Sequence, residues 1–228
     1  FEFRFNSLED SAFTSSGTSA IEVYIKNPAT KSDGLTGKRW DGALDNTGIE
    51  RMGAAGGGAI SRDRAKLHKA KSFTLMGWVR SADFTSQEEE ARIFYWASST
   101  GGLDVRTYKR QLRVALNGKL AGVIPLWNDK KDPNWWRFFA ITWDGQQLRA
   151  YAADLGENSV TPIFSKETEG ISEVTLPSVV FSIATAGGAR SFKGALDNLR
   201  LFVSESDNGA ALDVKEINEY LSRDSKVE

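Results

Sequence analysis

Cysteine is absent from this chain of 228 residues. Disulfides, thiol nucleophiles and cysteine-ligated zinc are therefore excluded, and the chain suits a reducing or an oxidising compartment equally well. Histidine occurs only once, as His68, among the basic neighbours of RDRAKLHKAKS. A catalytic base or a metal ligand normally has an orienting partner or sister ligands. We therefore expect His68 to be an exposed loop residue.

Long hydrophobic runs and an excess of one charge are also missing. No apolar stretch approaches the ~20 residues that a membrane span requires. The 29 lysines and arginines nearly balance the 30 aspartates and glutamates, which gives a formal net charge of −1. Such a balance provides no general attraction to nucleic acid or to an anionic membrane. We expect no nucleic-acid partner and no membrane span.

Short segments with alternating apolar and polar residues are abundant. In WRFFAITWDGQQLRAYAAD the alternation pauses at Asp144-Gly145 and then resumes, which is typical of two strands joined by a tight turn. Similar segments, separated by Gly, Asn, Asp or Ser, cover residues 72–80, 92–98, 102–108, 111–126, 178–184 and 194–204. The pattern predicts an all-β protein built as a two-sheet antiparallel sandwich of roughly ten to fourteen strands.

The length of the chain is sufficient for one large core. A chain of this size can bury roughly 70% of its unfolded surface, and β-sandwiches of this length often form one domain. We therefore expect residues 1–228 to form a single domain. The strand patterns predict that its core includes Phe139, Ile141, Leu148, Leu199 and Leu201.

One helix is predicted near the C-terminus, in LDVKEINEYLSR. Asp213 can cap its first turn and Glu216 completes a capping box. Val214, Ile217 and Leu221 then form an apolar stripe. We expect this helix to cover the sandwich with Ile217 and Leu221.

Three segments occur in a familiar order over residues 72–221: SFTLMGWVRS, WRFFAITWDGQQLRAYAADLG and FKGALDNLRLFV, the last followed by ALDVKEINEYL. They resemble the laminin-G-like jelly roll of the concanavalin A-like lectin/glucanase superfamily, mostly at apolar and turn residues. The family's lYvdG reads AYAADLG here, so we expect the next hairpin to differ. The resemblance implies a jelly-roll sandwich. Because such domains are frequent in secreted or cell-surface bacterial proteins, it also implies an extracellular, cell-surface or periplasmic location.

The catalytic motifs of this superfamily are missing. Its glucanases carry E-x-D-x-x-E on one strand, and retaining glycosidases need two carboxylates about 5 Å apart. The glutamates of SQEEEARIF are consecutive, so on a strand neighbours would point to opposite faces, and we expect a solvated loop. The R-x-E-x-R and Q-I-H patterns of jelly-roll alginate lyases are absent too. We predict that the protein is not an enzyme.

Asp197, in GALDNLRLFV, is the most informative single residue. It shares strand parity with Leu199 and Leu201, which directs it toward the apolar side. A carboxylate there needs a cation, backbone N–H groups or an arginine. In the resembled superfamily an aspartate at this place often helps to hold a structural calcium ion, and Asn6 and Asp10 could assist. The alternative is that Asp197 is hydrogen-bonded to a neighbouring loop or lies at the strand rim.

The seven tryptophans indicate a lectin, because sugar rings stack on flat aromatic faces. Trp78 and Trp143 lie on well-patterned strands and are predicted to be core residues. The adjacent Trp135 and Trp136 must face opposite ways in an extended chain, so only one can be buried. Trp127, which precedes the polar run NDKKDPN, is our predicted exposed stacking ring.

The other predicted ligand-binding residues are polar neighbours and a second ring, namely Asn128, Asp129, Arg106 and Tyr108. We predict a non-catalytic carbohydrate-binding module, for a glycan or polysaccharide, of an exported bacterial protein. The alternative is a cell-surface adhesion domain with a protein partner. A sugar site needs exposed aromatic rings in a shallow groove, whereas a protein site needs a flat apolar patch of several hundred Å².

Overall fold

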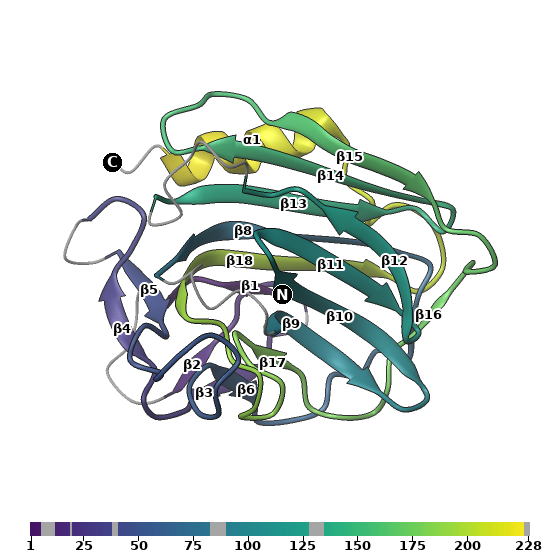
Figure 1. Cartoon of the computed structure of the whole chain (residues 1–228). Coiled ribbons are helices and arrows are strands. Elements are labelled where there is room, and N and C mark those ends of the chain that lie inside the picture. Colours follow the sequence, from purple (N-terminus) through teal and green to yellow (C-terminus); the bar gives the residue numbers. More distant parts are fainter. Residues whose placement is uncertain (6–11, 19, 38–40, 83–89, 128–134, 226–228) are drawn as a thin grey trace.

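The computed structural model of the chain (Figure 1) describes residues 1–5, 12–18, 20–37, 41–82, 90–127 and 135–225. Two antiparallel sheets of eight strands each are stacked face to face, and one helix follows the last strand. The predicted all-β, two-sheet antiparallel sandwich with a short C-terminal helix is confirmed. The described residues form 18 strands, more than expected, because four of them have only two residues.

Sheet A contains the long strands that carry the sequence resemblance. Its path has the order β15-β14-β13-β8-β18-β5-β4, and β1 pairs with β18 beside that path. The predicted Asp-Gly turn joins β13 to β14, with Gly145 at a φ of 92°. The strands of sheet A are β1 (Glu2–Phe3), β4 (Thr30–Asp33), β5 (Gly42–Asp45), β8 (Ser72–Ser81), β13 (Arg137–Trp143), β14 (Gln147–Asp154), β15 (Thr161–Glu167) and β18 (Gly194–Ser204).

Sheet B has the order β12-β11-β10-β9-β17-β6-β3-β2. Two hairpins connect β10 to β11 and β11 to β12, so these neighbours in space are also neighbours in sequence. A separate two-stranded sheet pairs β7 (Lys69–Ala70) with β16 (Val174–Thr175). The strands of sheet B are β2 (Ala12–Thr14), β3 (Glu22–Ile25), β6 (Ala59–Ser61), β9 (Ala91–Ser98), β10 (Gly101–Tyr108), β11 (Gln111–Leu116), β12 (Lys119–Ile124) and β17 (Ser182–Ile183).

The main core lies between the two sheets. Large apolar side chains from both inner faces fill it, among them Phe94 and Trp96 of sheet B and Trp143 of sheet A, none of which is exposed. The predicted core residues are all at most 1% exposed, which confirms the strand patterns: Phe139, Ile141, Leu148, Leu199 and Leu201. Burial of this apolar area is the dominant stabilising contribution to such a fold.

A second core lies between sheet A and the helix α1 (Val214–Ser225). Ile217 and Leu221 are fully buried there against Trp78 and its neighbours, as predicted, but Val214 is 40% exposed and lies outside the apolar stripe. The capping box is present, because the Asp213 and Glu216 side chains each accept the other residue's backbone N–H at 2.9 Å. No helix among the described residues is long and apolar enough to cross a bilayer.

Candidate functional site

Trp127 is a core residue, and the prediction that it is an exposed stacking ring is wrong. Its side chain is 4% exposed and belongs to the cluster between the sheets. The reason is that the chain remains ordered beyond β12. The backbone N–H of Leu126 donates to the carbonyl of Ile124, and that of Trp127 donates to the carbonyl of Arg110 at 3.2 Å. Its predicted partners Asn128 and Asp129 lie outside the described residues.

Among the described residues, the exposed tryptophan is Trp135, directly before β13. It is 68% exposed, whereas its neighbour Trp136 is 7% exposed and packs beneath the guanidinium of Arg80, 5.0 Å from the ring centroid. The prediction that only one of these two adjacent rings is buried is therefore confirmed. The sequence alone did not say which of the two rings is buried, because that depends on the cover that α1 provides for one face of sheet A.

Trp135 lies at the end of sheet A where β13 begins and β14 ends. Polar groups follow it there, because Arg137 pairs in register with Asp154 and forms an ion pair with it at 3.4 Å. Leu155, which is 43% exposed, donates its backbone N–H to the carbonyl of Trp136. We call Trp135, Arg137, Asp154 and Leu155 the Trp135 rim.

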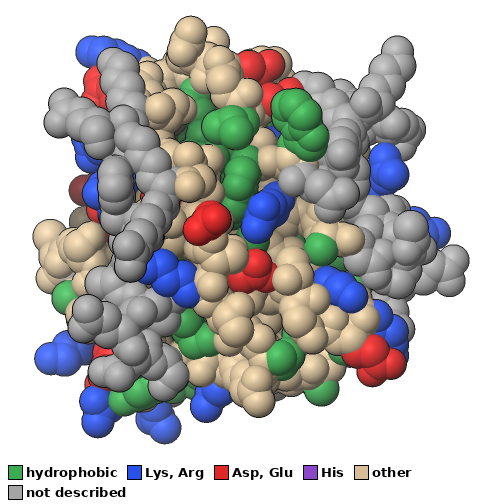
Figure 2. Space-filling model, turned by 90° about the vertical axis from the view of Figure 1, so that its left-hand side faces the viewer, with side chains coloured by type: hydrophobic (Ala, Val, Ile, Leu, Met, Phe, Trp, Pro, Cys, Tyr) green, Lys and Arg blue, Asp and Glu red, His purple; other side chains and the backbone are tan. Residues whose placement is uncertain are grey.

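Figure 2 shows the side of the molecule that carries the beginning of β13. On the described part of this face some hydrophobic side chains gather in the upper middle and others are scattered below, with acidic and basic side chains among them. The large exposed apolar side chains of the described residues are scattered over the chain, at Leu120, Trp135, Leu155, Val180 and Val214. Only two of them belong to the Trp135 rim, so the rim is narrower than the flat apolar surface of a typical protein interface.

Arg106 and Tyr108, two further predicted ligand residues, share one face of β10 in sheet B. Both are partly exposed. The guanidinium of Arg113 lies over the Tyr108 ring at 4.0 Å from its centroid, and the ammonium of Lys109 lies at 5.3 Å. Cations therefore already occupy positions next to this ring, which makes Tyr108 a poor stacking platform for a neutral sugar and a good support for positive charge.

A charged cluster surrounds Arg106. Asp104 accepts hydrogen bonds from Arg92 at 3.0 Å and from Arg106 at 3.2 Å, and Glu90 accepts one from Arg113 at 3.4 Å. Burial raises the pKa of Asp104, although Arg92 and Arg106 act in the opposite direction. Glu90 was predicted to lie in a solvated loop, but it binds arginines and its side chain is only 25% exposed.

Asp197 is fully buried, as predicted, but it lies on the other face of sheet A from Leu199 and Leu201. The pairing of β18 with β8 shifts between Asp197 and Arg200, and Asn198 has a φ of 47°. This bulge inserts one extra residue into β18. Side chains before and after the bulge therefore no longer follow one continuous alternation between the two faces of the sheet. Asp197 pairs with Trp78, on the side that α1 covers.

Backbone N–H groups satisfy the Asp197 carboxylate. One oxygen accepts the N–H of Leu35 at 2.9 Å and the other accepts that of Asn198 at 2.6 Å. Burial, followed by the nearby charge of Asp41, raises the pKa of Asp197 to about 7. Asp41 itself accepts the N–H and the hydroxyl of Thr36, both at 2.7 Å.

The contacts of Asp197 leave the calcium prediction untested. Calcium prefers six to eight oxygen ligands, but both Asp197 oxygens face N–H donors. Within the described ranges no three His, Cys, Asp or Glu side chains are grouped so that they could hold a metal ion. The proposed helpers Asn6 and Asp10 lie outside the described residues. Calcium at Asp197 stays a prediction. The alternative, hydrogen bonding to a neighbouring loop, agrees with the contacts that are present.

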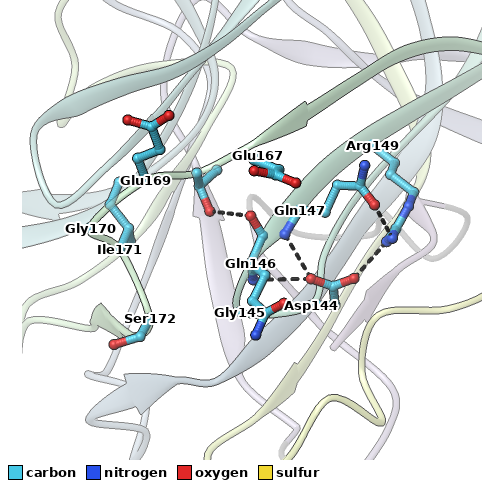
Figure 3. A pocket seen from close by; sticks show the side chains of 11 residues that line it. Asp144, Gly145, Gln146, Gln147, Arg149, Glu167, Glu169, Gly170, Ile171 and Ser172 are labelled. Atoms are coloured by element: carbon cyan, nitrogen blue, oxygen red, sulfur yellow. Dashed lines mark hydrogen bonds and ion pairs between the residues drawn. The ribbon is translucent and has the colours of Figure 1, made fainter.

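A polar pocket of about 530 Å³ lies at the turn between β13 and β14 (Figure 3). Asp144 lies at its centre and accepts the N–H groups of Gln146 and Gln147, at 3.0 and 2.7 Å, and a hydrogen bond from Arg149 at 2.7 Å. The residues that line it include no aromatic ring. These polar groups fix the turn by bonding one another, so this pocket is a weaker sugar site than the Trp135 rim.

The remaining sequence predictions for single residues agree with the structure. His68 is exposed, and its backbone N–H donates to Glu205 at 2.9 Å. Trp78 and Trp143 are fully buried. Sequence reasoning missed Arg200, which is also fully buried and is held by Asp224 and Glu2.

The solved structures to which this chain is similar include binding domains of botulinum neurotoxins. The receptor-binding domain of the botulinum neurotoxin C/D mosaic serotype matches with a TM-score of 0.68, at 13% identity over 97% of this chain and 50% of that one. The binding domain of Paraclostridial Mosquitocidal Protein 1 matches with a TM-score of 0.68, at 15% identity over 98% of this chain and 51% of that one. At such identities the likeness shows the β-sandwich fold alone.

A third match is the ligand-binding domain of botulinum neurotoxin serotype D in complex with N-acetylneuraminic acid. Its TM-score is 0.64, at 13% identity over 93% of this chain and 50% of that one. This chain therefore corresponds to about half the length of each of these neighbours, all of which are binding domains rather than catalytic ones. No family model and no curated protein matches the sequence.

Proposed function

We propose that the protein is a non-catalytic carbohydrate-binding module and that the Trp135 rim is its sugar site. The observation that carries this proposal is the 68% exposure of Trp135 at the end of the sandwich. A large flat ring costs free energy when it remains in water, and a sugar ring can cover it. Arg137 and Asp154 lie next to it in register and offer donors and acceptors for sugar hydroxyls.

The similarity to toxin receptor-binding domains supports the same function, because one of these neighbours was solved with an acidic sugar. The proposal includes membership of the laminin-G-like branch of the superfamily, one domain over residues 1–228, and an exported bacterial protein that acts outside the cytoplasm. A protein partner is the second candidate. Receptor-binding neighbours favour it, but the Trp135 rim holds only two of the large exposed apolar side chains of the described residues, Trp135 and Leu155.

One ring supports only weak binding. Aromatic pairs contribute roughly 0.5–1.5 kcal/mol beyond their buried area, so by analogy we expect dissociation constants between millimolar and micromolar. A glycan array identifies the ligand, and titration calorimetry then compares the native protein with Trp135→Ala. We expect this substitution to weaken glycan binding at least several-fold. The melting temperature should barely change, because substitutions of exposed side chains away from special features usually alter stability by about 0.5 kcal/mol or less.

Two further variants serve as controls. Leu120→Ala removes another exposed apolar side chain, 50% exposed on β12, and should leave binding intact. Trp127→Ala should instead destabilise the fold by about 3–5 kcal/mol, because it empties a core position. Unchanged affinity in Trp135→Ala would show that the sugar site lies elsewhere. If no glycan binds at millimolar concentration, the protein-partner candidate replaces this proposal.

A further inference from the structure

Three arginines form a row across sheet B. Arg92 on β9 pairs in register with Arg106 on β10, and Arg106 pairs with Arg113 on β11. Adjacent strands are about 4.8 Å apart, so this arginine row spans about 10 Å. Like charges directly opposite each other on neighbouring strands are destabilising. The row therefore breaks a local rule of sheet stability twice.

Among the described residues, the three arginines of the row have two carboxylate partners. Glu90 and Asp104 are shared among Arg92, Arg106 and Arg113. Nε of Arg92 forms an ion pair with Asp104 at 3.0 Å, but its Nη1 has no hydrogen-bond partner among the described residues, and the residue is only 5% exposed. Nε of Arg106 and Nε of Arg113 are also buried atoms without a hydrogen-bond partner among the described residues. Buried donors without an acceptor are costly, so this cluster is incomplete in hydrogen-bonding terms.

The hairpin next to the row breaks a second rule. Lys109 and Arg110 form the turn between β10 and β11 with φ values of 47° and 61°. Such two-residue turns favour Asn-Gly, because both central residues need positive φ. The next hairpin, between β11 and β12, has this pair: Asn117 and Gly118, at 50° and 75°. The turn between β10 and β11 thus has two cations at the positions that Asn-Gly occupies, with less strain, in the turn between β11 and β12.

The arginine row and the Lys109-Arg110 turn both contact the ring of Tyr108. The guanidinium of Arg113 and the ammonium of Lys109 both contact Tyr108. Arg106 and Arg113 reach solvent, with side chains that are 20% and 28% exposed. Deviations from local stability rules are expected where a site serves a function. An excess of arginine donors that reaches the surface fits an anionic ligand.

We propose that the arginine row and the Lys109-Arg110 turn bind an acidic polysaccharide through its sulfate or carboxylate groups. Planar guanidinium groups bind such anions with two parallel hydrogen bonds. Among the described residues, four arginines pair with the two carboxylates Glu90 and Asp104, namely Arg92, Arg106, Arg113 and Arg190. This site lies on sheet B, whereas the Trp135 rim lies at the end of sheet A.

The test uses the whole chain and replaces the strained turn with the pair found in the next hairpin. Lys109→Asn with Arg110→Gly should keep or raise the melting temperature, because Asn-Gly relieves the strain. We expect the same double variant to bind a heparin-derived hexasaccharide at least fivefold more weakly in titration calorimetry at low salt. A purely structural turn would gain stability without losing affinity. Arg113→Gln, which shortens the row, should weaken binding by a similar factor.

Controls separate a specific site from general charge attraction. Arg64→Gln with Lys66→Asn removes the same charge from exposed positions elsewhere and should leave the affinity within twofold. The desulfated hexasaccharide should bind at least tenfold more weakly than the sulfated one. Native affinity in the turn variant, equal loss in the control variant, or equally tight binding of a DNA duplex would each overturn the proposal. If Trp135→Ala is the only variant that loses binding of the sulfated hexasaccharide, the Trp135 rim binds both this hexasaccharide and the glycan of the proposed function.

Discussion

Asp197 is a fully buried carboxylate close to a second one, Asp41. A Cβ atom placed on Gly34 would lie 2.8 Å from an oxygen of each, so the two carboxylates flank that glycine. Both Asp197 oxygens accept backbone N–H groups, yet burial and the charge of Asp41 still raise its pKa to about 7. At the scale of single residues, this position therefore makes stability depend on pH near neutrality.

We expect the protein to become more stable as the pH falls from 8 to 5. The pKa of Asp197 is higher in the folded state than in the unfolded one, so its contribution is fully present below the unfolded pKa of about 4 and is lost as the pH rises through 7. The gain from pH 8 to pH 5 should be roughly 2–3 kcal/mol in urea unfolding. Asp197→Asn should remove most of this slope.

Calcium would change this result in a recognisable way. An ion bound at Asp197 would hold the carboxylate in its charged form and raise the melting temperature. If the N–H groups of Leu35 and Asn198 are the only partners of Asp197, the unfolding curves with calcium and with chelator should coincide. A shift of several degrees on chelation, with no pH slope, would instead support the calcium prediction.

At the scale of elements, Arg200 joins three parts of the fold. Its guanidinium is fully buried on β18, binds Asp224 of α1 at 2.7 and 2.6 Å, and binds Glu2 of β1 at 2.7 Å. Asp224 also accepts the indole N–H of Trp78 at 3.1 Å. The helix is therefore held on sheet A by a buried ion pair in addition to its apolar side chains.

Asp224→Asn should destabilise the fold by about 3–5 kcal/mol, because it leaves the charge of Arg200 buried with less compensation. Glu219→Gln is the matched control: it changes an exposed acid on the same helix and should cost less than about 0.5 kcal/mol. Chemical denaturation of both variants measures the difference. Equal midpoints would mean that α1 is held by Ile217 and Leu221 alone.

The sequence predicted elements better than positions within a site. Alternation and the Asp-Gly turn specified β13 and β14 because both signals are local, and the capping box specified the start of α1 for the same reason. The bulge at Asn198 carried no local signal, so Asp197 was assigned to the wrong face. Trp127 looked like a loop residue, because its burial depends on a contact with Arg110 of another hairpin.

At the scale of the whole molecule, the two sheets enclose one core and present different chemistry on their outer parts. Sheet A is covered by α1 and ends at the Trp135 rim, whereas sheet B carries the arginine row. A sandwich of this kind provides rigid strand ends and faces on which binding residues can be held in place. We propose that the exposed ring of Trp135 binds sugar.

The most direct measurement follows the indole N–H signals of the tryptophans by NMR during titration with a glycan ligand, with Trp135→Ala used to assign the Trp135 signal. We expect that signal to shift in a saturable way, while the signals of the buried Trp78 and Trp143 stay in place. The apparent dissociation constant should lie between millimolar and micromolar. A glycan that binds without moving the Trp135 signal would contradict the claim.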